Sequence, residues 1–333
     1  MTAVRYDVLG LGNAIVDVIT RADDDFLVKH GMHKGSMSLI DEARAAKIYD
    51  AMGPATEISG GSAANTIVGV AGFGGRAAFV GRVKNDQLGA AFGHDIRAAG
   101  VAFETVPSPA GPSTGRCYVL VTPDGERTMN TFLGAAQDLH PRDIDPDMVA
   151  GAAITYLEGY LWDPPHAKEA FVKAAAVAHE AKRLVALSLS DAFCVGRWRD
   201  EFLHLVRSGT VDLLFANEAE LQSLYQTDDF DAALTTLRGD ARHAVVTRGA
   251  KGCVVIDGPS TIVAPASPVE RVVDTTGAGD LFAAGFLFGT ARGLAKDKAA
   301  QLGALAAAEV ISHLGARPAT SLHAMVQGAG LIA

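Results

Sequence analysis

Asp274-Thr275-Thr276-Gly277-Ala278-Gly279-Asp280 is the stretch around which the rest of the chain is organised. The residues before it, 271–273, predict a short strand, and the apolar residues after it, 281–293, predict a long helix. The stretch is therefore expected to be a tight turn that leads from a strand into a helix.

Such a turn is suited to binding an anion. Small residues let the backbone approach a ligand closely, and the free N–H groups and positive dipole of a helix N-terminus attract negative charge. Asp280 adds a carboxylate beside this site. The combination favours phosphoryl transfer, in which the turn holds the transferred group and the carboxylate accepts a proton from an attacking hydroxyl. The alternative is an ordinary glycine-rich turn in which Asp280 caps the helix.

Composition limits the classes of protein to which the chain can belong. Its 333 residues suffice for one large α/β domain with an accessory element, or for two domains, and 49% of them are hydrophobic. The net charge of -9 argues against a protein that binds nucleic acid or a membrane surface, because such proteins usually carry a basic face.

The cysteines and the apolar segments bear on location. Cys117, Cys194 and Cys253 are odd in number and far apart, so we expect buried thiols in a reducing compartment and neither disulfides nor a zinc site. The chain shows no signal-peptide pattern and no apolar run of about 18 residues. We therefore expect a cytoplasmic protein.

The second half of the chain alternates strands with helices. Strands are expected at 154–158, 184–189, 211–215 and 243–247, and helices at 165–181, 197–207, 281–293 and 296–313. This alternation predicts an α/β fold: a mostly parallel sheet with helices on both faces, in three α/β/α layers.

A smaller unit is expected in the first half. Thr122-Pro123-Asp124-Gly125 lies between two alternating segments, 115–121 and 126–133, and predicts a β-hairpin. Extended segments at 16–20 and 36–40 can join this hairpin in a separate sheet. We therefore predict a single domain, residues 1–333, with a small β-sheet lid formed from about 14–40 and 113–133.

Polar turns follow several of the predicted strands. They are Asn13, Gly60-Gly61, Glu158, Asn217, Thr247 and the 274–280 turn. Ligands bind beyond the carboxyl ends of the strands in such sheets, so we expect one site at this edge. Gly10 and Gly12 make only a weak dinucleotide fingerprint, because Ile15 occupies the place of the third glycine.

Four motifs together resemble the ribokinase-like (PfkB) family of carbohydrate and nucleoside kinases, over nearly the whole chain. They are Gly60-Gly61-Ser62-Ala63-Ala64-Asn65 with the following 81–89 segment, Asn217-Glu218-Ala219-Glu220, Thr247-Arg248-Gly249-Ala250-Lys251-Gly252, and the 274–280 turn. The resemblance implies the ribokinase-like fold, ATP with Mg²⁺ and, in many members, a monovalent cation such as K⁺.

The resemblance also implies catalytic and substrate-binding residues. Asp280 is similar to the catalytic base for the substrate hydroxyl. The anion hole for the γ-phosphate would be Gly277, Ala278 and Gly279. The residues that grip the substrate would be Asn13, Asp17, Gly60, Gly61, Ser62, Asn65 and Leu133. A carboxylate such as that of Asp17 can accept hydrogen bonds from both hydroxyls of a ribose diol.

Cofactor residues are implied in the same way. Asn217 and Glu220 match the element that places Mg²⁺ and the phosphates, with Glu220 acting on the metal indirectly. The nucleotide-binding loop would be Thr247, Gly249 and Gly252. The loop that binds K⁺ in many members would be Asp274 and Thr276.

Within the family, the details are similar to the adenosine kinase-like members. Residues 10–17 resemble their opening motif, and residues 126–136 resemble a segment in which Arg127 closes onto the phosphates and Leu133 contacts the base. Glu158 departs from the pattern, because an acid stands where those kinases tend to have a small residue.

We therefore expect an ATP-dependent kinase that transfers the γ-phosphate to a primary hydroxyl of a nucleoside, adenosine and its 5′-hydroxyl first. The alternatives are a sugar kinase of fructokinase or ribokinase type and a non-catalytic nucleoside-binding protein. The expected partner is a small nucleoside or sugar, and neither nucleic acid nor a membrane. The chain is expected to be a monomer, or a homodimer that covers the exposed edges of the lid sheet.

Overall fold

A nine-stranded sheet forms the base of the molecule in the computed structural model, which describes residues 3–332. Its strands are β1 (Tyr6–Leu11), β5 (Ala77–Val80), β6 (Val101–Phe103), β9 (Ala152–Glu158), β10 (Leu184–Ser188), β11 (Leu213–Asn217), β12 (His243–Thr247), β13 (Cys253–Asp257) and β14 (Ser260–Ala264). They lie in the order β14-β13-β12-β11-β10-β9-β1-β5-β6. Neighbouring strands are parallel except β12 with β13 and β13 with β14, which confirms the mostly parallel sheet.

Helices cover both faces of this sheet, because successive residues of a strand point to opposite faces. Val8 of β1 belongs to one apolar cluster and its neighbour Leu9 to another. The first cluster includes side chains of α3 (Ser62–Gly72), α4 (Gln87–Ala98), α10 (Ala278–Ala291), α11 (Lys296–Val310) and α12 (Leu322–Gly328). The second includes side chains of α5 (Pro146–Ala150), α6 (Pro165–Glu180), α7 (Ala192–Arg207), α8 (Glu218–Tyr225) and α9 (Phe230–Asp240). The three-layer α/β/α sandwich is confirmed.

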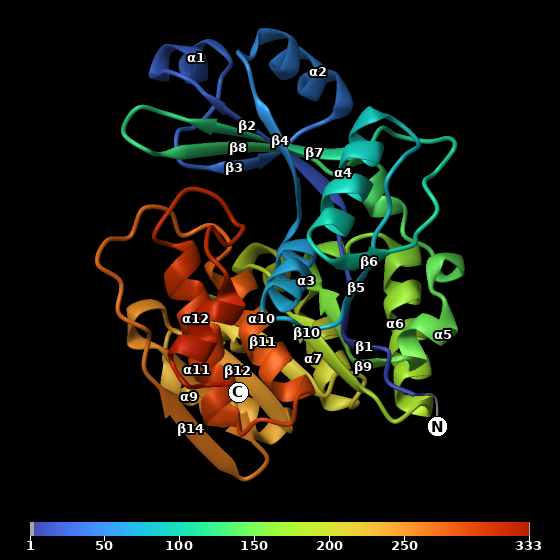
Figure 1. Cartoon of the computed structure of the whole chain (residues 1–333), viewed down its shortest axis with the longest axis vertical. Coiled ribbons are helices and arrows are strands. Elements are labelled where there is room, and N and C mark those ends of the chain that lie inside the picture. The colour runs from blue at the N-terminus through green and yellow to red at the C-terminus, as the bar shows by residue number, and fades with distance from the viewer. Residues whose placement is uncertain (1–2, 333) are drawn as a thin grey trace.

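A second sheet of five strands lies above the base (Figure 1). Its strands are β2 (Ile15–Arg21), β3 (Met37–Leu39), β4 (Thr56–Gly60), β7 (Gly115–Val121) and β8 (Arg127–Phe132), in the order β3-β8-β7-β2-β4. The helices α1 (Asp24–Lys29) and α2 (Glu42–Ala51) lie on the side of this sheet that faces away from the base. The predicted hairpin is the antiparallel pair β7 and β8. The sheet also contains β4, which pairs with β2, so the lid extends beyond the predicted 14–40 segment to Gly60.

The predicted strand at 271–273 is wrong. Val272 and Val273 are 56% and 41% exposed, and no strand within residues 3–332 pairs with them. Apolar residues form a strand only where they can pair with a neighbouring strand and bury their side chains in a core. The 274–280 turn is instead fixed by its contacts with the segment after α11, beginning with the Val273 N–H, which donates to the Ile311 carbonyl oxygen at 2.8 Å.

Other helix boundaries also differ from the prediction. The last predicted helix, 296–313, ends at Val310, and α12 was not predicted. The helix α7 begins at Ala192, before the predicted residue 197, because Asp191 caps it, and it is kinked at Trp198. Four short 3₁₀ helices complete the secondary structure of the described residues: Gly134–Asp138, Pro141–Asp143, Gly159–Trp162 and Gly249–Lys251.

Two expectations from composition can be compared with the structure. Cys117, Cys194 and Cys253 are buried and free, as predicted. Among the helices of residues 3–332, none combines the length and the apolar character needed to cross a membrane.

Candidate active site

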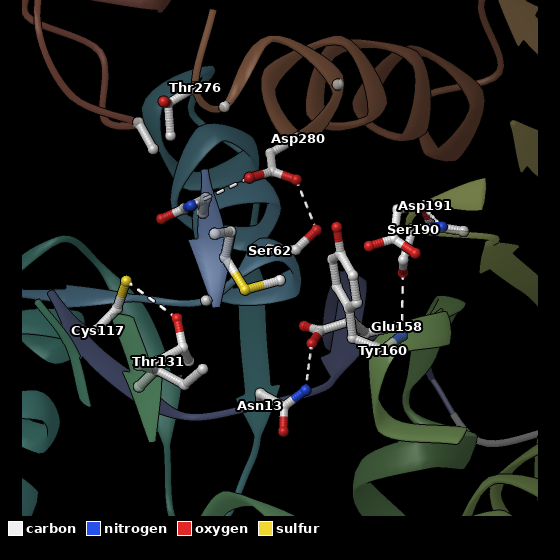
Figure 2. A pocket seen from close by; sticks show the side chains of 18 of the residues that line it. Asn13, Ser62, Cys117, Thr131, Glu158, Tyr160, Ser190, Asp191, Thr276 and Asp280 are labelled. Atoms are coloured by element: carbon white, nitrogen blue, oxygen red, sulfur yellow. Dashed lines mark hydrogen bonds between the residues drawn. The ribbon is translucent and has the colours of Figure 1, made fainter. Parts of the chain in front are cut away.

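A cavity of about 1060 Å³ lies between the lid and the carboxyl edge of the base sheet (Figure 2). It brings together most of the predicted site residues: Asn13, Asp17, Gly61, Ser62, Asn65, Arg127, Leu133, Asn217, Glu220, Thr247, Thr276, Gly277, Gly279 and Asp280. The other predicted residues do not line the cavity: Gly60, Ala278, Gly249, Gly252 and Asp274. Turns that lie far apart in sequence therefore meet at one edge of the sheet.

Asp280 lies in the first turn of α10, where side chains of α3 hold its carboxylate. Ser62 Oγ donates to Oδ1 at 2.6 Å (Figure 2), and Asn65 Nδ2 donates to Oδ2 at 3.0 Å. Burial raises the pKa of Asp280 above its usual range, and the two hydrogen bonds oppose that rise. The carboxylate is thus oriented towards a cavity in which it can accept a proton.

The predicted anion site lies at the start of α10. Gly277 has a φ of 79°, and a Cβ at this position would lie 2.8 Å from Ala316 Cα, so a side chain would be both strained and crowded. At Gly279 an added Cβ would meet nothing within 4 Å. The helix start has no side-chain cap. The Ala278 N–H donates to the Thr275 carbonyl oxygen at 3.2 Å, so an external anion such as a phosphate group would be bound by the neighbouring N–H groups of this turn.

Asp17 lies in β2, on the lid side of the cavity. Its carboxylate occupies the space above Gly60, where a Cβ would lie 2.4 Å from Asp17 Oδ2. Gly60 therefore serves by leaving room for this carboxylate, since it does not line the cavity itself. Burial raises the pKa of Asp17 to about 6, and the positive charges of Arg317 and Arg127 oppose that rise.

Glu158, which the sequence placed among the polar turns and marked as a departure from the family pattern, connects two parts of the site. It ends β9 and is 1% exposed. Its Oε1 accepts from Asn13 Nδ2 at 2.6 Å (Figure 2), and its Oε2 accepts from the Ala63 N–H at 2.8 Å. A Cβ at Gly12 would lie 2.3 Å from Oε2, so Gly12 makes room for the acid. Glu158 thus fixes the turn after β1 against the start of α3.

Glu158 makes stability depend on pH. Burial raises its pKa from the usual 4.5 to about 7. The folded protein therefore keeps the Glu158 proton between these values while the unfolded chain loses it, so wild-type stability falls as pH rises from about 4.5 to 7, by on the order of 3 kcal/mol. Glu158→Gln does not titrate. We therefore expect the difference in melting temperature, Glu158→Gln minus wild type, to be more positive at pH 8 than at pH 5.

The matched control for this prediction is Glu180→Gln, which makes the same substitution at an exposed residue of α6. Scanning calorimetry of the three proteins at both pH values measures the difference. An equal melting-temperature offset of Glu158→Gln at pH 5 and pH 8 would contradict the prediction.

Asn217 and Glu220 form a capping box at the start of α8. The Asn217 side chain accepts from the Glu220 N–H at 2.9 Å, and Glu220 Oε2 accepts from the Asn217 N–H at 3.0 Å. Burial raises the pKa of Glu220 to about 7. No group of three His, Cys, Asp or Glu side chains within residues 3–332 could hold a metal ion. A Mg²⁺ ion beside Glu220 would therefore take most of its ligands from nucleotide phosphates and water.

The predicted nucleotide loop is only partly at the cavity. Thr247, at the end of β12, lines it. Gly252 has a φ of 83°, and a Cβ there would lie 2.1 Å from the Ala264 carbonyl oxygen. Gly249 and Gly252 thus shape the turn between β12 and β13 and do not reach the cavity.

Asp274 is fully engaged by protein groups. Its Oδ1 accepts from the Thr276 N–H at 3.0 Å and from Thr276 Oγ1 at 2.7 Å. Its Oδ2 accepts from the Gly315 N–H at 2.9 Å and pairs with Arg127 Nη1 at 2.8 Å. Arg127 therefore links lid strand β8 to the 274–280 turn. A K⁺ ion bound by this carboxylate would have to compete with these four contacts.

Some residues near the cavity were not predicted. Ser188, Ser190, Asp191, Phe193 and Arg197 line it around the end of β10 and the start of α7. They lie at the end of a predicted strand, 184–189, or just after it, so the rule that found the other polar turns would have found this segment. Arg317 contacts the Ser59 backbone behind the cavity. No local pattern in the sequence distinguishes it from a surface arginine.

Comparisons with known proteins agree with the family resemblance. Residues 40–322 match the pfkB family carbohydrate kinase. The structure is similar to that of a probable sugar kinase protein from Rhizobium etli CFN 42, with 52% identity, a TM-score of 0.92 and coverage of 99% of this chain and 100% of that chain. It is also similar to adenosine kinase from Sinorhizobium meliloti, with 54% identity, a TM-score of 0.91 and coverage of 98% and 99%.

A third similar protein is adenosine kinase from Saccharomyces cerevisiae, 29% identical over 330 residues, which are 92% of this chain and 94% of that protein. The family match spans most of the chain, and the resemblance inferred from the motifs is confirmed. The chain belongs to the pfkB family of carbohydrate kinases and is a phosphotransferase with the ribokinase-like fold.

Proposed function

We propose that this phosphotransferase is an ATP-dependent nucleoside kinase whose substrate is adenosine, phosphorylated at its 5′-hydroxyl. The observation that carries the proposal is the position of Asp280: its carboxylate lies in the same helix turn as the anion site and faces a cavity whose opposite wall carries Asp17. Two of the similar proteins described above are adenosine kinases.

The acceptor half of the cavity suits a ribose. The Asp17 carboxylate can accept hydrogen bonds from two adjacent hydroxyls, which directs the remaining primary hydroxyl towards Asp280. Asp280 accepts the proton of that hydroxyl late in the transfer, as expected for a loose transition state. Ser62 and Asn65 keep the carboxylate in position for this step.

The donor half of the cavity suits a nucleotide. Kinase membership implies ATP with Mg²⁺, which supplies the phosphoryl group and neutralises its charge. The N–H groups at Gly277 and Gly279 would bind the γ-phosphate, and Thr247, Asn217 and Glu220 line the adjoining wall.

Apolar lid residues favour a nucleoside over a free sugar. The lining contributed by the lid strands includes Ile15, Met37, Leu39, Cys117, Val119 and Met129. A planar base buries apolar area against such side chains, whereas a free hexose or pentose presents mainly hydroxyls to them. Closure of the lid also excludes water, which would otherwise compete as phosphoryl acceptor.

An ATP-consumption screen tests the proposal. The acceptors are adenosine, inosine, guanosine, cytidine, ribose and fructose, each with and without K⁺, because the resemblance places a cation at the 274–280 turn. We expect adenosine to give the highest kcat/KM, by about tenfold or more. Turnover of free sugars alone would show a sugar kinase, and adenosine binding without turnover of any acceptor would show a non-catalytic binding protein.

A further inference from the structure

Arg317 lies on the loop between α11 and α12. This loop contacts two turns of the candidate active site: the 60–62 turn before α3, called the acceptor turn below, and the 274–280 turn before α10. We propose that Arg317 is a positioning residue for phosphoryl transfer, which holds the 60–62 turn in place and supplies the positive charge that balances Asp17 and Asp280. The inference rests on the proposed function, because it concerns the same acceptor site. None of the motifs that identify the family includes this residue.

The guanidinium binds the residue just before the acceptor turn. Its Nη2 donates to the Ser59 carbonyl oxygen at 2.6 Å and to Ser59 Oγ at 2.9 Å, and its Nε donates to the same carbonyl at 3.2 Å. Its Nη1 donates to the Ala64 carbonyl oxygen at 3.4 Å. The Ser59 N–H in turn donates to Asp95 Oδ2 at 2.8 Å. Ser59, which is 2% exposed, is thus held from both sides.

The position of Ser59 is transmitted to the catalytic carboxylate. The chain passes from Ser59 through Gly61, where φ is 98° and a Cβ would lie 2.2 Å from the Asn13 carbonyl oxygen. Such a tight turn transmits a displacement instead of absorbing it. The next residues carry the groups that hold Asp280: Ser62 Oγ and Asn65 Nδ2. Loosening Ser59 would therefore move both donors of Asp280.

The same loop supports the anion turn through its backbone. The Gly315 N–H donates to Asp274 Oδ2 at 2.9 Å. Ala316 packs against Gly277, at the start of α10. The three consecutive residues 315–317 thus contact the phosphate-binding turn with their backbone and the acceptor turn with the Arg317 side chain.

The charges that face Arg317 are carboxylates: Asp17, Asp95 and Asp280. Burial raises the pKa of Asp17 and of Asp280, and the Arg317 charge lowers both. Arg127 also acts on Asp17. The other titratable groups that face Asp280 are Asp17, Tyr156, Glu158 and Tyr160. Loss of Arg317 would raise the pKa of Asp280, so the proton acceptor would become protonated at a higher pH.

Two variants separate the charge of Arg317 from its hydrogen bonds. Arg317→Met removes both, whereas Arg317→Lys keeps the charge and loses the forked contacts with Ser59. We measure kcat and kcat/KM against pH with ATP, Mg²⁺ and adenosine. For Arg317→Met we expect kcat/KM to fall by about 10- to 100-fold. We also expect the acid limb of the pH profile, where kcat/KM falls at low pH, to move up by about one pH unit. For Arg317→Lys we expect a higher KM and an unmoved acid limb.

The control is Arg292→Met, which also removes an arginine that pairs with a buried aspartate. Arg292 pairs at 2.9 Å with Asp7 of β1, and neither residue lines the cavity. Its acid limb should stay in place. A folded Arg317→Met variant with an unmoved acid limb and near wild-type kcat/KM would overturn the inference. If that variant does not fold, an unchanged KM in Arg317→Lys overturns it.

The wild-type reaction distinguishes this inference from the proposed function. A wild type that phosphorylates only a sugar would overturn the nucleoside proposal, and the same variants would then be compared on that sugar. An upward shift of the acid limb there would still support the role of Arg317, because Asp280 serves any hydroxyl acceptor.

Discussion

Asp280→Asn is expected to lower kcat by about 10³-fold while nucleoside affinity changes only a few-fold. The substituted amide is nearly the same size and can still accept a hydrogen bond from Ser62 or Asn65, so the acceptor turn keeps its shape. It cannot accept the proton of the attacking hydroxyl. Steady-state kinetics measures the loss of turnover, and isothermal titration calorimetry measures nucleoside binding.

Asp145→Asn is the control for this variant. It makes the same chemical change at another helix start, since Asp145 caps α5 and does not line the cavity. We expect wild-type kinetics from it. Turnover by Asp280→Asn within tenfold of the wild type would show that Asp280 is not the proton acceptor.

Asp17→Asn is expected to weaken binding of a ribose-containing substrate by about 10- to 100-fold with a smaller change in kcat. The carboxylate offers two charged acceptors to a diol, and the amide offers one neutral acceptor, so one charged hydrogen bond of about 1.5–3 kcal/mol is lost. Calorimetry with adenosine and 2′-deoxyadenosine measures the effect. The variant should discriminate less between the two nucleosides than the wild type does.

Cys117→Ala serves as the control, because Cys117 is the β7 neighbour of Asp17 in the lid sheet and lines the same cavity. It should keep the wild-type preference for the ribonucleoside. If Asp17→Asn also keeps that preference, the ribose hydroxyls are bound by other groups.

The architecture was predictable because its signals are local and repeated. Alternating strands and helices in the second half of the chain indicate a parallel sheet whatever the packing details. The hairpin around 122–125 follows from the turn residues alone. Helix caps are local in the same way: the Asp41 side chain caps α2 and accepts from the Arg44 N–H, three residues away, at 2.7 Å.

Prediction failed where a segment depends on a partner that is distant in sequence. Residues 271–273 are apolar enough for a strand, but no strand of the described part of the chain, residues 3–332, pairs with them. In contrast, β4 pairs with β2 and so extends the lid, although nothing near β4 indicates this. Two glycines of the family motifs do not line the cavity: Gly60 makes room for Asp17, and Gly252 shapes a turn.

The sequence by itself determined the fold class and the family, and it predicted the chemistry of the 274–280 turn, because glycine conformation, helix dipoles and strand periodicity act over a few residues. Only the tertiary structure decided how that chemistry is supported. The sequence places Glu158 at the edge of the site without naming its partners and gives no sign of a role for Arg317, but folding brings Glu158 to Asn13 and Arg317 to Ser59. The physical reason is that burial and Coulomb interactions depend on distance in space, which a pattern along the chain does not contain.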